Sequence, residues 1–146
     1  MNKEELINII RQKLSEKIEN FEKLILETRS SANDTKSSMG DKYETGREML
    51  QQEINNLQVQ LNEILKQKDA LKTVLTKPSD KAEKGAAVKT DKGLFFISVS
   101  LGEIKIDNQK IICISPESPL AKAMNGRQKN EVFQINSINQ KIENIW

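Results

Sequence analysis

Two apolar stripes of helical period, separated by a short polar segment, constrain the fold of this chain more than any other feature. Apolar residues recur in each stripe at intervals of three and four, which places them on one face of a helix. The first stripe is Ile7, Ile10, Leu14, Ile18, Phe21 and Ile25; the second is Leu50, Ile54, Leu57, Leu61, Ile64, Leu71 and Leu75, interrupted by Lys68. Segment 30–38 between them carries turn formers and no large apolar residue. We therefore predict two long antiparallel helices, the pattern of a coiled-coil hairpin.

This predicted hairpin covers residues 1–77, with its tip at about 31–41. The first helix should span about 3–31. The second should begin near Ser38 and end at about residue 76, because a residue that precedes proline, here Pro78, avoids the helical region. Ser37 or Ser38 would cap the second helix, and Asp41 would lie near its positive end. A capping role is therefore an alternative to any functional role for Asp41.

Residues 78–92 have the composition of a solvated linker. With Lys77 this stretch holds five lysines and no aromatic residue, and it accounts for the whole net charge of +2. Such a composition is typical of a hinge between domains rather than of a binding patch.

From residue 93 the pattern changes to that of a small β-rich domain. Segment 94–99 is β-rich, and 103–106 and 110–114 form a hairpin around Asp107-Asn108. Ser118 should cap a short helix that has Pro119 at its first position and ends at Asn125-Gly126. The last two strands are predicted at 131–135 and 140–145. The fold class is therefore α+β, with the hairpin followed by a small β-rich domain at 93–146.

Composition excludes several kinds of chemistry. The chain has no histidine, which removes the commonest general base and metal ligand. Its one cysteine, Cys113, lies in an apolar run, so we expect a buried, inert thiol. No apolar run is long enough to cross a membrane, and the first residues lack the apolar core of a signal peptide, so we expect a cytoplasmic protein. A net charge of +2 provides no strong field for a membrane surface or for sequence-specific DNA binding.

Two segments resemble motifs of the Gre transcript-cleavage factors, a family of transcription elongation factors. The first contains Ile114-Ser115, Ser118-Pro119-Leu120-Ala121 and Gly126-Arg127, followed by Asn130-Glu131-Val132. The second, Tyr43 to Glu48, is similar to the family's tyrosine, three residues and Arg-Glu after the tip. The order of the parts also agrees, and the resemblance implies an FKBP-like C-terminal domain.

This resemblance implies RNA polymerase as the partner. In Gre factors the C-terminal domain docks at the rim of the polymerase secondary channel, and the coiled coil reaches the active site. Acidic residues at the tip help to hold a second magnesium ion and a water, and the polymerase then hydrolyses the RNA. The resemblance therefore implies a protein that is not itself an enzyme, has no cofactor of its own, and contacts nascent RNA only indirectly.

The candidate site residues follow from these motifs. Those expected to contact polymerase are Tyr43, Arg47, Ser118, Pro119, Lys122 and Arg127. The acids near the tip are Asp34, Asp41 and Glu44, of which Asp34 and Asp41 are candidate ligands for a Mg²⁺ shared with the polymerase active site. Structural alternatives are packing across the hairpin for Tyr43, pairing with an acid of the first helix for Arg47, and capping for Ser118 and Pro119.

The chain departs from the family pattern at the tip. Counted back from Tyr43, the family's two magnesium-binding positions fall on Lys36 and Met39, and the following polar positions fall on Gly40 and Lys42. Lysine repels a cation, and methionine is too soft a ligand for magnesium. We therefore favour a factor that occupies the channel over one that stimulates cleavage.

Two other functions are compatible with the sequence. The first is a coiled-coil interaction or adaptor protein unrelated to transcription, such as a dimer formed through the hairpin. The second is a prolyl isomerase, which the FKBP-like resemblance suggests but for which the domain has few aromatic residues. We expect the aromatic residues of the domain to be packing residues: Phe95, Phe96, Phe133 and Trp146.

Overall fold

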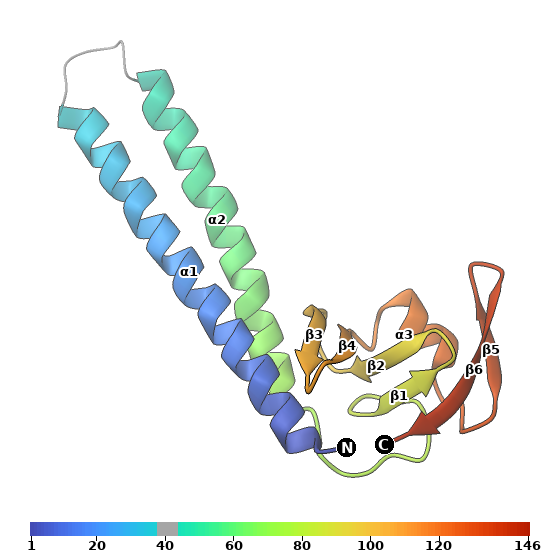
Figure 1. Ribbon diagram of the computed structural model, residues 1–146. Helices are drawn as coiled ribbons and strands as arrows, with labels where there is room; N and C mark the ends of the chain where they lie inside the picture. Colours follow the sequence, from blue (N-terminus) through green and yellow to red (C-terminus); the bar gives the residue numbers. More distant parts are fainter. Residues whose placement is uncertain (38–43) are drawn as a thin grey trace. The chain divides into compact units, whose positions relative to one another are not determined.

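The computed structural model describes residues 1–37 and 44–146, and for residues 33–37, 44 and 45 it describes the backbone alone. The fold is α+β: a helical hairpin is followed by a β-sheet domain (Figure 1). The helices are α1 (Lys3–Ser37), α2 (Glu44–Leu71) and α3 (Pro119–Met124). The strands are β1 (Ala87–Thr90), β2 (Gly93–Ile97), β3 (Gly102–Ile106), β4 (Gln109–Ile114), β5 (Val132–Ile135) and β6 (Ile138–Ile145).

Contacts divide the chain into two compact units. Residues Gln12–Lys68 form the hairpin unit, and Met1–Arg11 together with Asp69–Trp146 form the sheet unit. The first turns of α1 and the last residues of α2 therefore associate with the sheet, whereas the sequence assigned them to the coiled coil.

The hairpin unit confirms the two predicted stripes. Within it α1 and α2 lie side by side and run in opposite directions (Figure 1). Their buried core consists of Ile18, Ile25, Ile54 and Leu61, and Phe21, Leu57 and Ile64 pack against it half-buried. Every one of these residues belongs to a predicted stripe, because the same three-and-four spacing that defines a helix face defines the surface that a partner helix can cover.

The first helix is longer than predicted. It continues through the polar segment to Ser37, so Ser37 belongs to α1 and does not cap α2. Once a helix is formed, each added residue gains one hydrogen bond, and segment 30–37 contains no proline or glycine to stop it. The prediction of a break at residue 30 was therefore wrong. The predicted caps at Ser38 and Asp41 lie outside the described residues.

The second helix ends earlier than predicted, at Leu71 rather than near residue 76. The next three amides donate to carbonyls three residues back, and Thr73 Oγ1 donates to the carbonyl of Ala70 at 2.7 Å. When a side-chain hydroxyl donates a hydrogen bond to a carbonyl of the preceding turn, it competes with the helical backbone amide and favours such a tightened turn. Leu75, the last residue of the predicted stripe, lies beyond the helix and is 62% exposed.

Strands β1–β6 form one sheet in the order β3-β4-β2-β1-β6-β5. The predicted turn at Asp107 and Asn108 is confirmed and joins β3 to β4, and Asn136 and Ser137 join the last two strands, β5 and β6. All four residues have positive φ, between 50° and 65°. Two consecutive positive φ angles define the two-residue turn whose twist matches the strands.

The linker prediction is wrong in its second half. Residues 87–90 form β1, which lies inside the sheet between β2 and β6. Ala82, Ala86 and Val88 are fully buried, and Thr90 is buried with its hydroxyl donating to Gln140 Oε1 at 2.9 Å. The prediction failed because the lysine content of this segment is typical of a linker, whereas β1 is a short strand of small and medium-sized residues.

The core of the sheet unit contains the predicted packing residues. Phe95, Phe96 and Phe133 are buried, and Trp146 is half-buried and exchanges two backbone hydrogen bonds with Ala87. Cys113 is also buried, as predicted, and burial raises the pKa of its thiol to about 12. In the part of the chain that the structure describes, no helix is long and apolar enough to cross a membrane.

Candidate functional site

On both sides of the hairpin tip, at residues 33–37 and at 44 and 45, the structure describes the backbone and not the side chains. Asp34 lies in the last turn of α1, and Glu44 is the first residue of α2. Asp34 is therefore part of a helix and not of a loop, contrary to the predicted break. Asp41 and Tyr43 lie outside the described residues, so the binding of Mg²⁺ by Asp34 and Asp41 together stays a prediction.

Arg47 is the only candidate near the tip whose side chain is described. It is half-buried in the first turns of α2. Pairing with an acid of the first helix was the structural alternative for Arg47, but among the side chains that the structure describes Arg47 forms no ion pair.

The C-terminal candidates are built around the short helix α3. Ser118 is its N-cap: φ is −64° and ψ is 152°, and Ser118 Oγ accepts a hydrogen bond from the amide of Ala121 at 3.2 Å. Pro119 occupies the first turn, where its missing N–H costs nothing. Ser115 Oγ accepts from the amide of Glu117 at 3.1 Å, which forms the turn before the cap. The predicted structural roles of Ser118 and Pro119 are thus confirmed.

Buried residues attach α3 to the sheet unit. Ala121 and Met124 point into the core, where Met124 is fully buried beside Phe133 and Ile142. Because positions 121 and 124 share the inner face of the helix, position 122 faces outward. Lys122 is accordingly exposed.

Arg127 belongs to a loop that is tied to the segment before β1. The carbonyl of Arg127 accepts from the amide of Ala82 at 2.8 Å, and the amide of Gly126 donates to the carbonyl of Ala82 at 2.8 Å. The guanidinium Nη1 of Arg127 lies 3.6 Å from Glu131 Oε2, with both side chains nearly half exposed. The backbone of Arg127 is therefore fixed by the sheet unit, while its charge is partly balanced on the surface.

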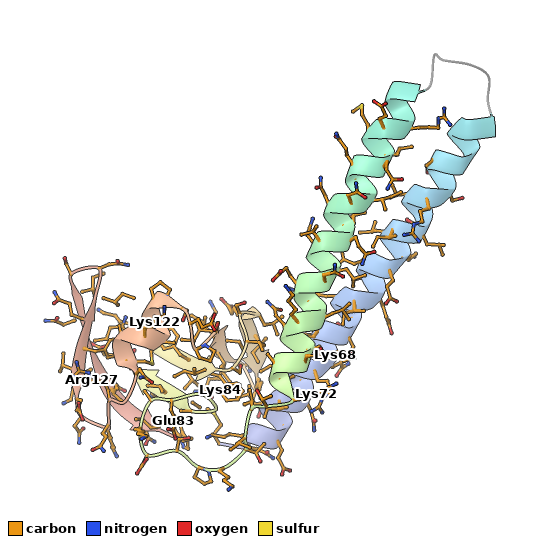
Figure 2. All side chains as sticks on the ribbon, turned by 180° about the vertical axis from the view of Figure 1, so that it is seen from behind. Lys68, Lys72, Glu83, Lys84, Lys122 and Arg127 are labelled. Carbon is orange, nitrogen blue, oxygen red and sulfur yellow. The ribbon has the colours of Figure 1, made fainter. Side chains whose placement is uncertain are left out.

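The two cations differ in how free they are to bind a partner. Among the described residues Lys122 forms no ion pair, whereas Arg127 is paired with Glu131. Figure 2 shows Lys122 on α3 and Arg127 near it, with Glu83 and Lys84 on the segment before β1. Lys84 Nζ donates to Thr73 Oγ1 in the residues that follow α2. The structure thus brings together four of the six predicted contact residues: Ser118, Pro119, Lys122 and Arg127.

One buried cation has no signal in the sequence. Lys3 is only 5% exposed, and its ammonium donates to the carbonyl of Lys77 at 2.7 Å and to Ser79 Oγ at 3.4 Å. Burial lowers the pKa of Lys3, and the charge of Glu83 opposes this shift. These contacts join the start of α1 to the residues just after α2, both within the sheet unit.

No cluster of three or more potential metal ligands occurs among the residues that the structure describes. The candidate ligands Asp34 and Asp41 are not in that set of described side chains. The magnesium site at the tip therefore stays a prediction.

Comparison with known proteins found similar solved structures. No family model matches the chain, and no curated protein matches it. The crystal structure of GreA factor homolog 1 (Gfh1) of Thermus thermophilus is 15% identical, with 93% of this chain and 94% of that chain covered and a TM-score of 0.38. A structure of the transcription factor Gfh1 is 14% identical, with 91% of this chain and 89% of that chain covered and a TM-score of 0.38.

Proposed function

We propose that this protein is a Gre-like transcription factor that binds RNA polymerase at its secondary channel. One observation carries the proposal. The segment whose sequence resembles the Gre motif, Ser115 to Arg127, folds as a capped helix and a tied loop on the same chain as a long helical hairpin. A motif that folds as one ordered surface element can serve as a docking element.

The dimensions of the hairpin suit insertion into a channel. Within the hairpin unit α1 runs from Gln12 to Ser37, which at 1.5 Å per residue corresponds to about 40 Å. Two paired helices form a slender rod, and the rod is held together by one narrow apolar core. Such a rod can reach a site deep inside a partner.

The proposed polymerase contacts lie on both units. On the sheet unit we assign Lys122 as the principal contact, because it is exposed and unpaired among the described residues, with Arg127, Ser118 and Pro119 beside it. Near the tip we assign Arg47 and Tyr43. A solvent-exposed lysine can steer an encounter with an acidic surface at little structural cost.

We further propose that binding occurs without stimulation of RNA cleavage. Lys36 and Met39 occupy the two positions where the resemblance to Gre factors places magnesium-binding carboxylates. Hard divalent cations take oxygen ligands, and a nearby ammonium raises the cost of binding them. Asp34 and Asp41 are the acids that would hold a shared Mg²⁺ if cleavage were stimulated.

The binding proposal is tested with RNA polymerase from the same source. Lys122→Glu should weaken binding by about tenfold, since it reverses one contact charge at the interface. The matched control is Lys105→Glu, an exposed lysine on β3 at the far edge of the sheet. Equal affinities for the wild type and Lys122→Glu, or no binding by the wild type, would overturn the assignment.

Cleavage is tested on a stalled, backtracked polymerase complex. We expect the wild type to leave the RNA cleavage rate unchanged or to lower it, and Asp34→Ala and Asp41→Ala to behave in the same way. Faster cleavage that these two variants abolish would refute the non-cleaving proposal and assign Mg²⁺ ligation to the tip acids.

A further inference from the structure

The hairpin unit carries an apolar groove that the proposed function does not use. It lies between α1 and α2 and has a volume of about 520 Å³. Phe21 and Ile64 line its inner part, where they pack against the buried core. Leu24 and Val59 line its outer part and are 46% and 61% exposed.

Leu24 on α1 and Val59 on α2 place exposed apolar side chains on both sides of this groove. Leu24 lies three residues after Phe21 on α1, and Val59 lies five before Ile64 on α2, so the four surround one groove rather than being scattered over the surface. Scattered apolar residues on a surface need no explanation, but a grouped set beside a groove is typical of an interaction site.

Opposite charges lie at one end of this groove. Lys17 belongs to its α1 side and Glu63 to its α2 side. Because the two helices are antiparallel, the start of the α1 side and the end of the α2 side fall at the same end of the groove. Lys17 forms no ion pair among the described residues, and Glu63 pairs only with Lys66, at 3.4 Å and with both side chains mostly exposed. An exposed pair of this kind is weak and readily exchanged.

We propose that the groove binds the same groove of a second copy of this chain, in a parallel dimer of hairpins. The two copies are related by a two-fold axis that runs along the hairpins, so α1 of each copy packs on α2 of the other. Lys17 of one copy then meets Glu63 of the other, and the symmetry creates this pair twice. Leu24 and Val59 become buried in a four-helix bundle.

The charges select this arrangement over the alternative. A two-fold axis across the hairpins would pack α1 on α1 and reverse one groove relative to the other. Lys17 would then lie opposite the end that carries Leu24 and Val59, and Lys17 and Glu63 would lose water without gaining a partner. Desolvating a charge without pairing it is unfavourable, so the parallel arrangement is preferred.

This dimer goes beyond the proposed function and does not depend on it. The groove is short compared with a standard protein interface, so association should be weak, in the micromolar to millimolar range. A test without polymerase therefore separates the two proposals, and failure of either leaves the other standing.

The test is sedimentation equilibrium of the whole protein over a wide concentration range. Lys17→Glu and Glu63→Lys should each weaken dimerisation about tenfold, because each reversal makes two repulsive pairs per dimer. The double variant Lys17→Glu/Glu63→Lys should restore wild-type association. Leu24→Asp should also weaken it at least tenfold, whereas Leu26→Asp, at an exposed leucine outside the groove lining, should not. Helical circular dichroism checks that each variant is folded.

Several results would overturn the proposal. A wild type that stays monomeric at every concentration would exclude the dimer. A dimer that Leu24→Asp leaves intact would place the interface elsewhere. A double variant that dimerises no better than the single variants would exclude the parallel two-fold arrangement.

Discussion

Gly85 is the position where the backbone of the sheet unit tolerates a side chain least. Its φ is +90°, and a Cβ built there would lie 3.0 Å from the carbonyl oxygen of Leu75, which is a backbone atom that cannot rotate away. The amide of Gly85 also donates to the carbonyl of Ile97 at 2.8 Å, which fixes the approach of this segment to β2. Gly85→Ala therefore adds two independent penalties.

The two penalties can be separated by a matched glycine. Gly102 has φ +89°, and a Cβ added to it would meet no atom within 4 Å, so Gly102→Ala tests the backbone angle alone. We expect Gly102→Ala to lower the free energy of unfolding by about 1–2 kcal/mol. Gly85→Ala should lower it by about 2–4 kcal/mol, since the contact with Leu75 adds a cost of the size found for overpacking.

A third glycine provides a control of opposite sign. Gly46 lies in α2 with nothing within 4 Å of a Cβ, so Gly46→Ala should stabilise the helix by about 0.5–1 kcal/mol. Unfolding in urea is followed by the fluorescence of Trp146, the single tryptophan, for the sheet unit and by helical circular dichroism for the hairpin unit. If Gly85→Ala costs no more than Gly102→Ala, the Leu75 contact has no energetic effect and the reasoning fails.

Three further predictions concern single side chains. Ser118→Ala should destabilise the sheet unit by about 1 kcal/mol, because it removes the cap of α3, whereas Ser118→Asp keeps a capping oxygen and should not. Equal urea midpoints for the wild type and both variants would contradict the capping role. Because burial lowers the pKa of Lys3, the folded state binds fewer protons than the unfolded state at pH values just below 10.5, so the free energy of unfolding should rise with pH there. Lys3→Met should abolish this rise and the exposed control Lys13→Met should keep it; equal pH slopes for Lys3→Met and the wild type, measured by urea unfolding, would refute the assignment. Cys113, with its pKa raised to about 12, should react with iodoacetamide at pH 8 far more slowly in the folded protein than in urea, and fast native alkylation would show that the thiol is not buried.

Periodicity predicted the elements that depend on local sequence. The apolar spacing located both long helices, and the residues with turn preference located the β3–β4 and β5–β6 hairpins and the cap of α3. Each of these features depends on residues that lie close together in the chain, so it can be predicted from one sequence. For the same reason Ser118 and Pro119 could be placed at the start of a short helix, whereas Lys122 and Arg127 became candidates only through the resemblance to the Gre motif.

Elements that depend on distant partners were missed or misplaced. Strand β1 has only four residues, among them Lys89, and Val88 and Thr90 become recognisable as strand residues only when β2 and β6 pair with them. A weak signal was present, since Lys89 alternates with buried neighbours and Asp91-Lys92 forms a turn before an apolar strand. The buried ammonium of Lys3 has no such signal, because its acceptors lie more than 70 residues away.

The α+β class, the two helix faces and the local turns are encoded in the amino-acid order alone, because each depends on side-chain spacing and backbone preference over short range. Three other features emerge only in the folded chain: where the helices end, the strand that the lysine-rich segment contributes to the interior of the sheet, and the surface residues that gather at the hairpin groove. Those outcomes depend on which segments meet in space, where burial of apolar surface and pairing of backbone groups outweigh local composition.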